Sequence, residues 1–184
     1  MTLPPPPLPQ FFETFPRFLL VPFLRESLGI EGIHREPSTE EIAATRRFMS
    51  LSSMSATALG DLQAVYAPGC PLREREGMDV RIGCYGPPRG GPLMVKRVQD
   101  LCRKANVSPD PWALHVEFEA LHPYLDGNGR AGRALWAWHM HSRGLQPFRL
   151  PFLHRFYYQT LADLGPGVAT RWKARTRPDA PKPP

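Results

Sequence analysis

The sequence predicts an all-α fold with one small β element. Apolar residues recur at helical spacing through most of the segment from residue 11 to residue 172. Residues that cap or start helices precede several of these runs, and only one short segment alternates in the manner of a strand. With 184 residues, the chain is long enough to bury a core without disulfides or metals. We therefore expect one helical domain over residues 11–172.

The first half of this domain is predicted to hold three helical regions. The first apolar run contains Pro16 and Pro22, which should divide it into short helices. Ser38 or Thr39 should cap the next helix, because two glutamates follow in its first turn, where carboxylates favour the positive end of the dipole. A further short helix is expected over residues 54–66, where an Ala-Pro-Gly sequence ends it.

The second half begins with the strand-like segment 79–85, which a run of glycine and proline then breaks. The following helices are expected over residues 92–104, 112–121 and about 129–141, with weaker candidates over 152–164 and 168–173. In the first of these, the buried residues should be Leu93, Val95, Val98 and Leu101.

Composition excludes several classes of protein. The formal net charge is +6, and 42% of the residues are hydrophobic, which is typical of a globular chain. We find no apolar run of the roughly 18 residues that a membrane span needs, and no secretory signal. Three cysteines without CxxC spacing argue against a disulfide framework and suit a reducing cytosol, so we expect a cytoplasmic protein. Residues 1–10 and the basic residues 173–184 are rich in proline and are interpreted as tails.

The segment from His122 to Arg133, HPYLDGNGRAGR, combines residue types that suit phosphate chemistry. Two of its glycines can adopt positive φ at the entrance of a helix, where free N–H groups and the dipole bind anions. Two arginines lie three residues apart on one helical face, and each offers a fork suited to phosphate. The predicted cradle for more than one phosphate group consists of Gly127, Asn128, Gly129, Arg130 and Arg133.

Two further residues of this segment add reactivity. Asp126 is a hard oxygen ligand at the rim of the cradle, and magnesium in nucleotide sites commonly uses one or two carboxylates plus phosphate oxygens. His122 is a base of a type whose reference pKa lies near neutrality. Together these residues indicate an enzyme that activates a hydroxyl beside a magnesium-bound polyphosphate.

The same segment resembles the Fic-domain signature, HxFx(D/E)GNGRxxR, and departs from it only at Tyr124, where the family usually has Phe. The resemblance implies a Fic-type helical domain that transfers AMP from ATP, with Mg²⁺, to a Ser, Thr or Tyr hydroxyl of a target protein, including possible self-modification. It implies that His122 takes the hydroxyl proton and that Asp126 holds Mg²⁺. It further implies an anion hole at residues 127–129, with Arg130 on the phosphate chain and Arg133 on the γ-phosphate.

The resemblance also leaves alternatives open. Gly129 stands where the Doc-type kinases of the family have Lys, which favours nucleotidyl over phosphoryl transfer. Transfer of UMP or GMP, and removal of AMP, remain alternatives, since relatives carry out these reactions. A catalytically silent nucleotide-binding module is a more distant one. Nucleic-acid binding is prompted by the net charge, but no DNA- or RNA-binding signature is present, so neither a nucleic acid nor a membrane is expected as a partner.

The resemblance also implies roles for two regions outside the catalytic loop, residues 122–133. The family has a β-hairpin flap before this loop, which implies a flap over about residues 78–90, with Arg81 and Ile82 facing target or nucleotide. Strand addition would hold an extended target segment there. Ser27 to Gly32, SLGIEG, matches the family's inhibitory motif, which implies an inhibitory helix over about residues 22–33 whose Glu31 pairs with Arg133.

Overall fold

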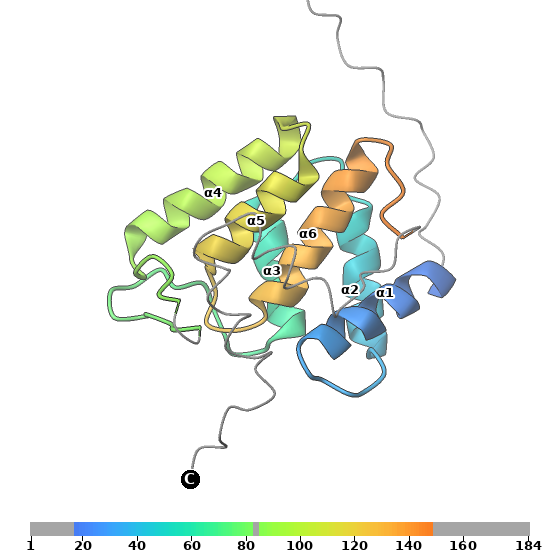
Figure 1. Ribbon diagram of the computed structural model, residues 1–184, viewed down its shortest axis with the longest axis horizontal. Helices are drawn as coiled ribbons and strands as arrows, with labels where there is room; N and C mark the ends of the chain where they lie inside the picture. Colours follow the sequence, from blue (N-terminus) through green and yellow to red (C-terminus); the bar gives the residue numbers. More distant parts are fainter. Residues whose placement is uncertain (1–16, 83–84, 149–184) are drawn as a thin grey trace, which may run out of the picture.

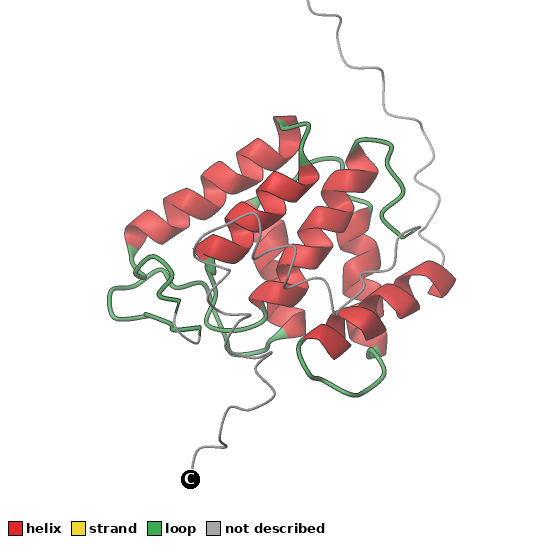
Figure 2. Cartoon of the chain, in the orientation of Figure 1, coloured by secondary structure: helices red, strands yellow, loops and turns green. Residues whose placement is uncertain are grey.

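The computed structural model describes residues 17–82 and 85–148, which form six α-helices joined by loops (Figure 2). The helices are α1 (Arg17–Ile30), α2 (Thr39–Met49), α3 (Ala56–Tyr66), α4 (Pro92–Val107), α5 (Pro111–Leu121) and α6 (Asn128–Ser142). No β-strand occurs among these residues. The predicted helical fold is thus confirmed for this part of the chain. The proline-rich tails and the helices expected over 152–164 and 168–173 lie outside the described residues.

Helix α6 is the centre of the bundle. It packs against α1, α2, α3 and α5, while α4 packs on α5 and α3 at the edge opposite α1 (Figure 1). The sequence of α6 suits this place, because small residues alternate with large apolar ones, and Ala131, Ala134, Leu135 and Trp138 are all buried. The start of α6, which follows the predicted catalytic loop, is therefore held by several other helices.

The helix starts follow from local capping chemistry. The Ser38 hydroxyl accepts from Glu41 N at 3.1 Å, and the Glu41 carboxylate accepts from Ser38 N at 2.7 Å, which completes a capping box for α2. Asp110 Oδ1 accepts from two backbone N–H groups at the start of α5, where Pro111 is the first helical residue. These local signals explain why the helices begin where the sequence predicts.

Two predictions about the helices are wrong. Pro22 does not divide the first apolar run, because α1 continues through it. A proline there removes only the bond to the carbonyl of Phe18, whose side chain is exposed, while Leu20, Phe23 and Leu24 are buried and hold the helix in place. Leu93 is 58% exposed rather than buried, and Met94 takes the core position instead.

The β-hairpin flap expected over residues 78–90 is not seen. What remains of it is one isolated antiparallel bridge between Ile82 and Tyr85, with N–H···O distances of 2.9 and 3.0 Å; residues 83 and 84 lie outside the described chain. A side chain holds the base of this loop, since Gly90 N donates to Asp79 Oδ1 at 2.9 Å. Because that N–H already donates to a carboxylate, it is not available for a hydrogen bond between β-strands. We call residues 78–90 the flap segment below.

None of the helices within the described ranges is long and apolar enough to cross a membrane.

The short connection before the flap segment runs along the catalytic loop. Leu72 and Tyr124 form an isolated antiparallel bridge, and Leu125 N donates to Pro71 O at 3.2 Å. This pairing brings the loop between α3 and α4 against the loop between α5 and α6.

Candidate active site

The catalytic loop begins at the C-terminal end of α5 with His122. This residue caps the helix in the left-handed conformation, with φ 47° and ψ 60°, and it is the one non-glycine residue with positive φ among those described. The conformation costs a residue with a Cβ on the order of 1 kcal/mol or more, so it persists only where the surroundings enforce it. His122 is partly exposed, and its side chain leaves α5 at the mouth of the loop.

A side-chain amide closes the loop into a ring. Asn128 Oδ1 accepts from Tyr124 N, and Asn128 Nδ2 donates to Tyr124 O, both at 2.8 Å. Asn128 itself is 1% exposed. In this arrangement its side chain braces the loop, and its backbone N–H belongs to the first turn of α6. These two hydrogen bonds fix the shape of the loop from within the protein.

Gly127 is required at the turn into α6. Its φ is 75°, and a Cβ at this position would lie 2.8 Å from the Ala67 Cβ. Gln63 fixes the same turn from α3, because its Nε2 donates to Asp126 O and to Cys70 O, both at 2.8 Å. The turn thus combines a left-handed glycine with a buried amide brace from another helix.

The N-terminus of α6 offers the anion site that the sequence predicts. The first helical bond runs from Ala131 N to Gly127 O at 3.0 Å, so the N–H groups of residues 128–130 have no acceptor within the helix. Gly129 lies directly beneath the Glu31 carboxylate, and a Cβ added there would overlap Glu31 Oε1. A carboxylate therefore lies at this helix end, where the dipole favours negative charge.

Arg133 binds that carboxylate. The guanidinium is fully buried, and its Nη2 donates to Glu31 Oε1 at 2.8 Å. Its Nε donates to Ser27 Oγ at 2.8 Å, and Nη2 also donates to Ser27 O at 2.9 Å. The structure thus brings Ser27, Glu31 and Arg133 together over a separation of more than one hundred residues. Glu31 lies in the turn just after α1 rather than inside a helix.

The core beneath Arg133 contains a buried histidine. His115 on α5 is bonded through Nδ1 to Gly132 O at 2.9 Å. Burial, together with the positive charge of Arg133, lowers the pKa of His115 to about 3. The imidazole is therefore neutral at physiological pH and does not add a second cation beside Arg133.

Arg130 is bound by neighbouring helices, and its predicted contact with a phosphate chain stays a prediction. Its guanidinium is 8% exposed and donates through Nη1 to the Tyr66 carbonyl, with Cζ 6.0 Å from the centre of the Tyr66 ring. The same nitrogen lies 4.0 Å from Glu41 Oε1, and Arg35 already holds that carboxylate at 2.7 and 2.8 Å. In this arrangement Arg130 anchors the start of α6 to α2 and α3.

Asp126 is exposed at the loop, and its Oδ1 accepts from Gly127 N at 2.7 Å. An exposed carboxylate at the rim of an anion site fits a divalent cation shared with phosphate. Within the part of the chain that the structure describes, no three His, Cys, Asp or Glu side chains gather as a metal site. A cation here would accordingly draw most of its ligands from a nucleotide and from water.

The two residues predicted in the flap segment differ in their surroundings. Arg81 is exposed, whereas Ile82 is 8% exposed and forms the bridge with Tyr85. Of the pair, only Arg81 presents its side chain to solvent. Sequence reasoning missed two other residues that shape the site, Gln63 and Arg73, because both act through backbone carbonyls that lie far away along the chain.

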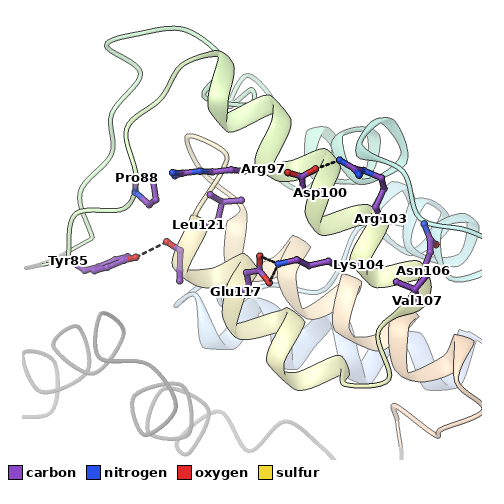
Figure 3. Close-up of a pocket in the computed structure, with 11 residues that line it drawn as sticks. Tyr85, Pro88, Arg97, Asp100, Arg103, Lys104, Asn106, Val107, Glu117 and Leu121 are labelled. Atoms are coloured by element: carbon purple, nitrogen blue, oxygen red, sulfur yellow. Dashed lines mark hydrogen bonds and ion pairs between the residues drawn. The ribbon is translucent and has the colours of Figure 1, made fainter.

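A groove of about 910 Å³ lies between α4 and α5 and is bounded by Tyr85 and Pro88 of the flap segment (Figure 3). Its lining includes Leu121, the residue directly before His122. Four of its five charged side chains pair with each other, Arg103 with Asp100 and Lys104 with Glu117. The groove therefore carries little unbalanced charge, and the features that suit phosphate lie at the start of α6 instead.

A comparison with protein families finds a match over part of the chain. The family model described as the Fic/DOC family matches residues 63–140, which run from within α3 through the catalytic loop and most of α6. Glu31 and α1 lie before the matched segment. No curated protein matches the chain. The match supports a Fic domain in this chain, within a family whose members transfer nucleotide-derived groups to proteins.

Proposed function

We propose that this protein transfers AMP from ATP to a Ser, Thr or Tyr hydroxyl of a protein, and that Glu31 restrains the reaction. The observation that carries the proposal is the carboxylate of Glu31, which lies at the start of α6 and is bound by the buried Arg133. A site that holds one anion by a helix N-terminus and a guanidinium fork suits a phosphate chain.

The chemistry assigned to His122 is general base catalysis. The imidazole takes the proton of the target hydroxyl, and the hydroxyl oxygen attacks the α-phosphorus. The bond from that phosphorus to the oxygen that bridges to the β-phosphate breaks, and pyrophosphate leaves. A positioned base contributes about 10²–10⁴-fold to such a step. The helix-end N–H groups at Asn128 and Gly129 favour the negative charge that develops on the phosphate oxygens.

Asp126 is the residue that would hold Mg²⁺, with phosphate oxygens and water as the remaining ligands. When bound, the cation neutralises phosphate charge and orients the leaving group. The exposure of the Asp126 carboxylate supports this role, and Gly127 N fixes its direction at 2.7 Å.

Restraint by Glu31 follows from competition for Arg133. A carboxylate that already takes the Nη2 hydrogen bond at 2.8 Å occupies the fork that a γ-phosphate would use.

The test measures label on protein. Wild type and Glu31→Gly are incubated with Mg²⁺, a mixture of soluble cell proteins and each of the four α-labelled nucleoside triphosphates. We expect label from ATP above the others, on the protein itself or on a target. His122→Ala should reduce the rate at least about 100-fold while nucleotide affinity stays within a few-fold. His34→Ala, which removes an exposed histidine, is the matched control.

Asp126→Ala should abolish the Mg²⁺ dependence of nucleotide binding, as measured by calorimetry. The absence of transfer from all four nucleotides by Glu31→Gly, in a protein that still binds nucleotide, would overturn the proposal. Preferential label from UTP or GTP would retain nucleotidyl transfer and replace AMP as the transferred group.

A further inference from the structure

Arg73 lies between α3 and α4 and is fully buried. Its guanidinium donates only to backbone carbonyls in the bonds that the structure gives it. Nε reaches His122 O at 2.9 Å, and Nη2 reaches Leu121 O at 3.0 Å. Nη1 reaches Pro88 O at 2.9 Å and Met78 O at 3.4 Å. One side chain therefore joins the end of α5 to both ends of the flap segment.

The backbone of Arg73 extends the same junction. Arg73 N donates to Pro123 O at 2.9 Å, and Gly91 N donates to Arg73 O at 2.9 Å. Main chain and side chain together thus hold residues 121–123 and the region where the flap segment meets α4. A buried side chain that served packing alone would not need this pattern of donors.

The positive charge of Arg73 is stabilised by the groups around it. Burial lowers the pKa of the guanidinium, and the nearby carboxylate of Asp79 opposes that shift. The last carbonyls of α5 carry the negative end of the helix dipole, and this end favours a cation. A buried charge is costly unless hydrogen bonds satisfy it, and these carbonyls do so. The guanidinium of Arg73 is therefore stabilised by the carbonyls of the residues at which the catalytic loop begins.

We propose that Arg73 is a positioning residue that holds His122 in its left-handed conformation and couples it to the flap segment. The inference rests on the proposed role of His122 as the base. The positive φ of His122 persists because its carbonyl is bound from outside its own helix, by Arg73 Nε. A displacement of a catalytic group by about 1 Å costs on the order of 100-fold in rate. Movement of the flap segment would reach His122 through this guanidinium, beside the bond from the Tyr85 hydroxyl to Ala120 O at 2.8 Å.

The test compares Arg73→Lys with Arg25→Lys, a control in which the arginine belongs to an exposed ion pair with Glu36. A lysine keeps the positive charge, but its single ammonium cannot reproduce the fork. At saturating nucleotide, Arg73→Lys is expected to lower kcat by about tenfold or more, with the KM for nucleotide within about threefold. Amide hydrogen exchange at residues 121–125 should become faster, and Arg25→Lys should match wild type in every measurement.

A second measurement uses the wild-type protein and does not depend on how the variants fold. The Arg73 Nε–H should be protected from exchange and should show scalar coupling to the carbonyl carbon of His122 by NMR. Absence of that coupling would overturn the inference, as would a folded Arg73→Lys variant with kcat within twofold of wild type. Coupling and slow exchange in a protein that transfers no nucleotide would retain the positioning of His122 and reject the proposed function instead.

Discussion

Replacing Glu31 by glycine should raise the rate of nucleotide transfer and lower the stability of the fold. The contact that is lost joins Glu31 Oε1 to Arg133 Nη2 at 2.8 Å, with the arginine fully buried and the glutamate side chain 25% exposed. A charge-assisted hydrogen bond of this kind contributes about 1.5–3 kcal/mol. If that free energy opposes productive nucleotide binding, its removal accelerates transfer roughly ten- to a hundredfold. The bonds from Arg133 to Ser27 should keep the guanidinium in place.

The assay is transfer of α-labelled ATP beside urea unfolding of the same samples. Glu36→Gly is the matched control, since it removes an ion pair with Arg25 that solvent screens, and it should leave both the urea midpoint and the activity close to wild type. Arg133→Ala combined with Glu31→Gly should lose the gain, because the two residues form one contact. Activation that survived the loss of Arg133 would refute competition for its fork, and equal rates for wild type and Glu31→Gly would refute restraint altogether.

Two further predictions concern the packing around this contact. Gly129→Ala places a methyl group onto the Glu31 carboxylate, so it should cost roughly 1–3 kcal/mol in urea unfolding of wild type and clearly less in the Glu31→Gly background; equal losses would assign the strain elsewhere. His115→Asn keeps a donor for Gly132 O but no longer titrates. Because the native pKa of about 3 lies below the unfolded value near 6.5, the unfolded state binds more protons between these limits, and wild type should lose up to about 1.4 kcal/mol per pH unit as the pH falls through that window. The free energy of unfolding of the variant should fall less steeply as the pH is lowered through that window. An unchanged dependence on pH would exclude His115 as its source.

The helices and the catalytic loop could be predicted because their determinants are local. Ser38 and Glu41 stand three residues apart and make a capping box, and Pro111 begins a helix because it needs no N–H donor there. The cradle residues share one twelve-residue segment, so their proximity follows from the sequence. The pairing of Glu31 with Arg133 was expected from a family resemblance rather than from periodicity, and the structure brings the two side chains together.

The remainder depends on contacts that no short pattern contains. Pro22 is tolerated because burial of α1 outweighs one missing hydrogen bond. The flap fails to form strands where Asp79 takes the place of a backbone acceptor. Arg130 contacts Glu41 and Tyr66 on other helices. Arg73 was missed because its acceptors lie as many as 49 residues away. An arginine within a Pro-Leu-Arg sequence carries no local signal of burial.

The amide of Asn128 bears on how the protein ages. Asn128 precedes Gly129, and an Asn-Gly pair is the sequence in which the following backbone nitrogen most readily attacks the side-chain carbon and releases ammonia. Here both ends of the amide are held by Tyr124 at 2.8 Å, and Gly129 N belongs to the first turn of α6. The nitrogen cannot approach the carbon without breaking the ring of the loop. We therefore expect the side-chain amide of Asn128 to resist deamidation during long storage, and to become reactive only when the loop opens.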